Sequence, residues 1–157
     1  MKFKTLRAVF TLLLLLVMGV MIVGFALRTG IASVSAAPVK HGELLVTKEC
    51  SAYYGQAGEF CTITSSTLWQ IKVGSTLYYD QAANVPAGFL DSNVLLDARD
   101  GNWAMGRCTL DLATGSGLCT FSDGTGELAG FNARVGVSPP TDGVNWTWDG
   151  TYSFTKD

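Results

Sequence analysis

Histidine, basic charge and helical periodicity are all scarce in this chain of 157 residues. His41 is its single histidine and lies near the start of the part that we expect to fold, where it cannot be held in the geometry of a Ser-His-Asp triad. The four cysteines lack the short Cys-x-x-Cys spacing of structural zinc sites. We therefore predict no metal and no cofactor.

Basic charge is scarce after residue 37. Seven basic residues stand there against thirteen acidic ones, a net charge of −6, because Lys2, Lys4, Arg7 and Arg28 precede this point. A domain with this balance repels phosphate backbones and anionic lipid headgroups. We predict that it binds no nucleic acid.

The chain has one long apolar run, Ala8–Leu27, with basic residues before it and a small, polar stretch after it. This order is typical of a secretory signal, and residues 1–36 then end in a small-residue cleavage site at Ala36. The run is also long enough to cross a bilayer as a retained helical anchor. Both interpretations place the rest of the chain outside the cell, either secreted or anchored to the outer side of the membrane. Contact with a membrane is predicted only through residues 8–27, if they are retained.

All four cysteines lie in the exported part, as expected of an oxidising compartment. Three pairings are possible, but the intervals from Cys50 to Cys61 and from Cys108 to Cys119 are equal. We predict these two local disulfides. Each closes a loop for which chain entropy gives about 3 kcal/mol.

No segment after residue 40 repeats its apolar residues every 3.6 positions, whereas turn signals recur regularly. The exported part is therefore predicted to be all-β, either a sandwich or, as successive hairpins favour, an antiparallel up-and-down barrel of about eight strands. Residues 37–59 are predicted to be an N-terminal extension with a disulfide-stapled loop and an edge strand at 43–48. The barrel is assigned to residues 60–157, with strands at 60–68, 75–80, 89–97, 103–112, 118–122, 128–137 and 144–154.

Two local patterns support these strands. Asp100-Gly101 is typical of a two-residue type I′ hairpin turn. In the last segment Val144, Trp146 and Trp148 alternate with polar residues, and Tyr152 and Phe154 continue the same face. Folding the chain about residues 113–114 also sets Cys108 opposite Cys119.

The run GSGLCTFSDGTGELAGFNARVGV from Gly115, followed by WTWDGTY, resembles the C-terminal part of the allene oxide cyclase and dirigent superfamily. The resemblance implies an eight-stranded antiparallel barrel whose narrow lumen holds one apolar molecule. Cyclases of this kind resemble one another in an acidic residue on the first strand, but Phe60–Leu68 contains no carboxylate. We therefore assign no catalytic residue.

Aromatic side chains are the candidates for a ligand pocket in such a barrel, although they could equally fill its lumen. The predicted set is Trp69, Tyr79, Trp103, Phe131, Trp146, Trp148 and Tyr152. Charged residues near turns, among them Asp97, Arg99, Asp111, Glu127 and Arg134, are interpreted as solvated surface charge. Two functions stay open: an exported barrel that binds a small apolar molecule or acts through its surface without catalysis, and a cyclase or isomerase that folds a reactive apolar substrate in its lumen.

Overall fold

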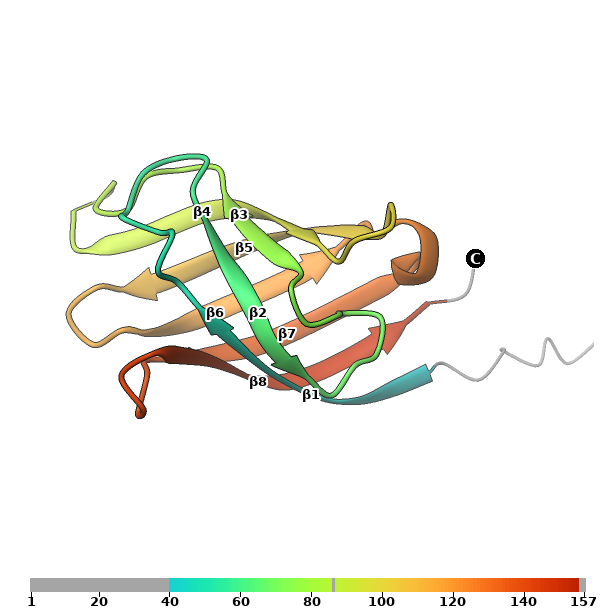
Figure 1. Cartoon of the computed structure of the whole chain (residues 1–157). Coiled ribbons are helices and arrows are strands. Elements are labelled where there is room, and N and C mark those ends of the chain that lie inside the picture. The colour runs from blue at the N-terminus through green and yellow to red at the C-terminus, as the bar shows by residue number, and fades with distance from the viewer. Residues whose placement is uncertain (1–39, 86, 156–157) are drawn as a thin grey trace, which may run out of the picture. The chain divides into compact units, whose positions relative to one another are not determined.

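The computed structural model describes residues 40–85 and 87–155, drawn in colour in Figure 1. The predicted export segment, residues 1–36, lies outside the described residues. Within the described ranges no helix combines the length and the apolar character needed to span a bilayer.

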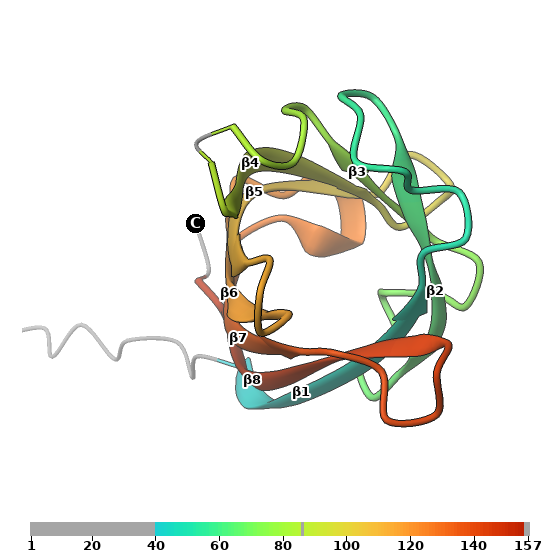
Figure 2. The same cartoon turned by 90° about the vertical axis from the view of Figure 1, so that its left-hand side faces the viewer.

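Eight antiparallel strands follow one another around a closed barrel, and the last strand pairs with the first (Figure 2). Their bounds are β1 Lys40–Glu49, β2 Phe60–Ser66, β3 Thr76–Tyr79, β4 Phe89–Asp97, β5 Trp103–Asp111, β6 Ser116–Ser122, β7 Phe131–Ser138 and β8 Asn145–Phe154. A 3₁₀ helix, η1 Gly126–Leu128, precedes β7. The predicted up-and-down barrel is thus confirmed over a sandwich.

The structure differs from the sequence-based prediction in three places. Residues 40–49 form a full barrel strand paired with both β2 and β8, so the barrel begins before residue 60 and β1 is not an edge strand. The turn between β4 and β5 is longer than a two-residue turn, because residues 98–102 separate the two strands; Arg99, Asp100 and Gly101 within it have positive φ. Residues 126–130 turn through η1 instead of starting a strand at Leu128.

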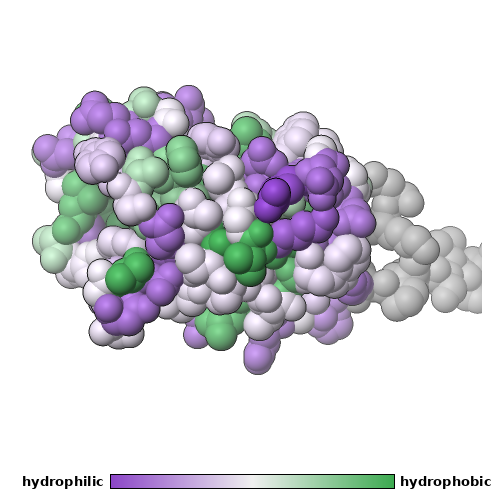
Figure 3. Space-filling view, viewed as in Figure 1, coloured by the Kyte–Doolittle hydropathy of each residue, from purple (hydrophilic) through white to green (hydrophobic). Residues whose placement is uncertain are grey.

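The lumen is built by the alternation of side chains along each strand. In β7 Phe131, Ala133, Val135 and Val137 are buried, while the residues between them are exposed or half-buried. Apolar residues of the other strands join them in one continuous core. The outer face seen in Figure 3 is a mosaic of polar and apolar residues. Every strand therefore contributes apolar residues to the core, while some apolar residues such as Leu45 and Met105 stay exposed on the outer face.

Both predicted disulfides are present. Cys50 is bonded to Cys61, with Cα atoms 4.2 Å apart, and Cys108 is bonded to Cys119, with Cα atoms 4.1 Å apart. Cys108 and Cys119 are direct register partners on β5 and β6. Directly opposite residues on antiparallel strands have Cα atoms close enough for a disulfide to join them. The two bonds indicate an oxidising environment.

The two ends of the barrel are covered differently. At the end where β1 begins and β8 finishes, Leu128 of η1 is fully buried beneath the loops, together with Leu68 and Ile71. The loops at the opposite end, which Figure 2 presents to the viewer, join β1 to β2, β3 to β4, β5 to β6 and β7 to β8. The cavity described below lies at this second end.

Gly150 allows β7 and β8 to approach closely inside the barrel. A Cβ added at Gly150 would overlap the carbonyl oxygen of Arg134 and lie 2.7 Å from Cα of Val135. Gly136 lies on β7 and points away from the lumen. There an added Cβ would meet only the Asp149 carbonyl oxygen, at 3.5 Å. Glycine is thus sterically required at position 150 but not at position 136.

We predict that Gly150→Ala lowers the free energy of unfolding by about 1 to 3 kcal/mol, the usual cost of overpacking. The matched variant Gly136→Ala should change it by less than about 0.5 kcal/mol, as surface substitutions do. Urea denaturation of both variants measures the difference. Equal stabilities would show that the contact at Gly150 does not constrain the strands.

Candidate functional site

A cavity of about 160 Å³ remains in the lumen near the end that carries the β1–β2 loop. Its wall is mostly apolar and includes Leu90, Leu110, Val137 and Trp146. Both disulfides also line it. The cavity thus lies at the end of the lumen away from η1.

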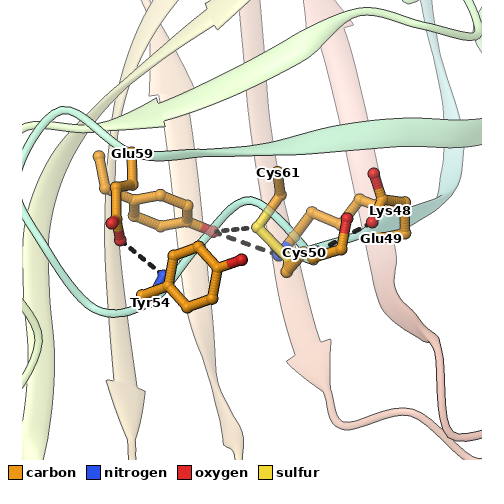
Figure 4. The surroundings of a disulfide bond; sticks show 8 residues. Lys48, Glu49, Cys50, Tyr54, Glu59 and Cys61 are labelled. Carbon is orange, nitrogen blue, oxygen red and sulfur yellow. Dashed lines mark hydrogen bonds between the residues drawn. A yellow bond between two sulfur atoms is a disulfide. The ribbon is translucent and has the colours of Figure 1, made fainter.

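Lys48 is the one charged residue of the cavity wall. Its side chain, only 3% exposed, extends from β1 toward the Cys50–Cys61 disulfide (Figure 4). The Nζ atom donates a hydrogen bond to the Tyr79 hydroxyl at 3.2 Å and lies 3.5 Å from Sγ of Cys50 and 3.7 Å from Sγ of Cys61. A lysine amine is thereby buried among phenol, sulfur and apolar groups.

Aromatic rings surround the same amine. Nζ lies 5.9 Å from the ring centre of Tyr79, 5.6 Å from that of Trp146 and 5.8 Å from that of Trp148. At these distances the negative faces of the rings attract a cation. They replace part of the hydration that the ammonium loses on burial.

Strand alternation places Lys48 in the lumen, and a β-bulge on β2 lies opposite it. Leu44, Val46 and Lys48 share the inward face of β1. The pairing of β1 with β2 shifts between Thr47 and Lys48, so that Thr64 is an extra residue on β2. Because bulges re-aim side chains, Cys61 returns to the inward face, where it meets Lys48.

The loop between β1 and β2 covers the cavity. Tyr53 from this loop packs on Tyr79, with ring centres 4.7 Å apart. The Glu59 carboxylate accepts hydrogen bonds from the backbone N–H groups of Tyr54 and Gln56, and Gly58 N–H donates to the Tyr79 carbonyl. The disulfide and these bonds hold Tyr53 over the cavity.

Burial changes the acid–base properties of the site. It lowers the pKa of Lys48 to about 7, because no water solvates the charged amine. Burial also raises the pKa of Tyr79, so this phenol keeps its proton. Near neutral pH the amine therefore exchanges between its charged and neutral forms.

The structure brings together three of the seven aromatic residues predicted for a pocket. Tyr79, Trp146 and Trp148 line the cavity with Lys48. Phe131 is fully buried closer to η1, in an aromatic cluster with Phe121 and Phe154, and Tyr152 packs on Phe154. A ligand-binding role for these residues stays a prediction.

The remaining two aromatic candidates lie outside the cavity. Trp69 is 61% exposed in the loop between β2 and β3, and Trp103 is 38% exposed on β5. None of the charged residues at Asp97, Arg99, Asp111, Glu127 and Arg134 contributes to the wall of this cavity. Among the described residues no group of histidine, cysteine and acidic side chains has the arrangement of a metal site.

Sequence reasoning missed Lys48. The run ELLVTK was interpreted as a short edge strand, in which a terminal lysine is ordinary. The sequence did contain a signal for an inward-facing Lys48: alternation along the strand puts it on the same face as Leu44 and Val46. That signal acquires meaning only when both neighbours of the strand are known.

The fold and the cavity define a class: a disulfide-stabilised, closed eight-stranded antiparallel barrel with a buried lysine in its lumen. Comparison with models of protein families, with characterised proteins and with solved structures finds no match. The function is therefore argued from the site itself.

Lys48 should make stability depend on pH. Its pKa is about 7 in the folded protein and about 10.4 in an unfolded chain, so the unfolded state binds more protons between these values. The free energy of unfolding should rise from about pH 7 upward, by at most about 1.4 kcal/mol per pH unit, and this gain is absent at lower pH. Above pH 10 the raised pKa of Tyr79 has the opposite effect, and the free energy of unfolding falls as the pH rises.

Lys48→Met should remove this rise and be more stable than the wild type at pH 7, because a buried charge is replaced by an apolar group of similar length. Lys72→Met is the matched control, since Lys72 forms an exposed ion pair with Asp100, and it should keep the rise. Denaturant titrations between about pH 7 and 9.5 measure both. If the free energy of unfolding of the wild type does not change over this pH range, burial does not disfavour the charged form of Lys48.

Proposed function

We propose that this protein is an exported barrel that binds a small apolar molecule in the cavity beneath the β1–β2 loop. The observation that carries the proposal is the space itself, about 160 Å³ left unfilled among the buried side chains of the lumen. Protein interiors seldom leave voids larger than a water molecule. Secretion or anchoring through residues 8–27 belongs to the same proposal.

The size of the cavity limits the ligand. Engineered apolar cavities of about 150 Å³ bind benzene or xenon. The ligand is accordingly a single ring or a short branched chain. The covering loop is joined to β2 by Cys50–Cys61 and to the barrel by hydrogen bonds, so the cavity is preformed and little ordering is needed on binding.

The alternative, a cyclase or isomerase of the allene oxide cyclase and dirigent type, has less support. Pockets for drug-sized molecules measure roughly 300 to 1,000 Å³. A cavity of about 160 Å³ is too small to fold a long reactive chain into a ring. The wall also offers Lys48 but no carboxylate for acid–base catalysis.

Toluene tests the binding proposal. Because the ring matches the cavity, we expect it to shift the NMR methyl signals of Leu90, Leu110 and Val137 in a saturable way. Val137→Phe should abolish these shifts, since the added ring occupies the space. Leu45→Phe, on the outward face of β1, should leave them unchanged.

Native mass spectrometry of the purified protein before and after organic extraction then tests for a natural ligand. A mass that falls on extraction supports the proposal and gives the ligand's mass. The proposal fails if toluene produces no saturable shift in the folded wild type and the protein carries no extractable mass.

A further inference from the structure

We infer that the ligand of this cavity carries a carboxylate group, which pairs with the ammonium of Lys48 and accepts hydrogen bonds from the cavity wall. The inference rests on the proposed function and adds the chemical class of the ligand. Three buried groups carry it: the Lys48 amine, the Trp148 indole N–H and the Tyr53 hydroxyl.

The Lys48 ammonium is poorly supplied with acceptors. An ammonium group has three donors and no acceptor. The Tyr79 hydroxyl is its one oxygen partner, and the two disulfide sulfurs, at 3.5 and 3.7 Å, are weak acceptors. A ligand oxygen would complete its hydrogen bonding.

Two residues that line the cavity each carry a polar atom without a partner. Trp148 and Tyr53 both line it, and the Trp148 Nε1 and Tyr53 hydroxyl oxygen are buried without a hydrogen bond to the protein. The Trp148 side chain has no exposed surface at all. Buried polar groups in native proteins are nearly always paired, so atoms like these need a partner from outside the chain.

The excess of donors selects the kind of ligand. The charged amine and the indole N–H can only donate hydrogen bonds. The hydroxyl can donate or accept one. An ionised carboxylate only accepts hydrogen bonds, so its chemistry matches this excess of donors. An amine ligand would add donors and a second positive charge.

Within residues 40–85 and 87–155, Lys48 has no anionic partner. The wall of the cavity contains no aspartate or glutamate. In the adjoining chain the Glu49 carboxylate accepts a hydrogen bond from Ser51 N–H, and the Glu59 carboxylate binds N–H groups within the loop. The other groups around Nζ are Tyr79, Trp146, Trp148 and the disulfide. The cavity thus holds a cationic site whose counter-charge is left to a ligand.

The fitting ligand is a short branched or single-ring carboxylic acid, given the volume. Isovalerate is a suitable probe, and isovaleramide is its neutral counterpart of nearly the same shape. Isothermal titration of the full barrel at about pH 6, where Lys48 is charged, should show the acid binding at least about tenfold more tightly than the amide.

The preference should depend on Lys48 and on pH. Lys48→Met should lose the preference for the acid while it still binds toluene, which shows that its cavity is intact. In the wild type the affinity for isovalerate should fall by about tenfold per pH unit above about pH 7, as the free amine loses its proton, whereas the affinity for the amide should not change. The NMR signal of Lys48 Cε should report a higher pKa when isovalerate is bound.

The outcomes separate the two proposals. If neither toluene nor isovalerate binds and the protein carries no extractable mass, the proposed function is wrong. If toluene binds but isovalerate is not preferred over isovaleramide, or if Lys48→Met keeps that preference, the inference is wrong and the binding proposal stands. Covalent trapping of isovaleraldehyde on Lys48 by borohydride, without binding of the acid, would also overturn it in favour of a carbonyl ligand.

Discussion

The pairing of β1 with β8 is the interaction on which the rest of the molecule depends. Ten consecutive register pairs, from Lys40 with Phe154 to Glu49 with Asn145, join the first strand to the last. Without them the sheet would have two free edges and no interior. Closure also sets Lys48 beside Trp146 and near Trp148, so the same ladder that completes the barrel assembles the candidate site.

The lumen combines two solutions to the problem of filling a narrow barrel. Toward η1 it holds large side chains, with Phe121 packed on both Phe131 and Trp148. Toward the opposite end a cavity remains, and its wall combines aromatic rings with two disulfides and Lys48. Placing a lysine where a leucine would be more stable is a cost to folding, and such costs are typical of functional positions.

Much of the fold was predictable because turns and alternation are local signals. The strand at Phe89–Asp97 and both disulfides were placed correctly from spacing and composition alone. The site was less accessible to such reasoning. Trp69 and Trp103 are as aromatic as Trp146, but whether a side chain faces the lumen depends on the register of distant strands. Lys48 was missed for the same reason, because the inward face of β1 can be identified only when the closure of the barrel is known.

The place where the barrel begins and finishes has a consequence for engineering. Lys40 and Phe154 are register partners, so the first and last residues of the barrel are neighbours, at the end away from the cavity. Neighbouring ends favour circular permutation: a short linker could join them, and new termini could be opened in an exposed loop such as residues 141–143. A reporter fused beside the cavity would then sense its occupancy directly, while the disulfides keep the rearranged chain in register.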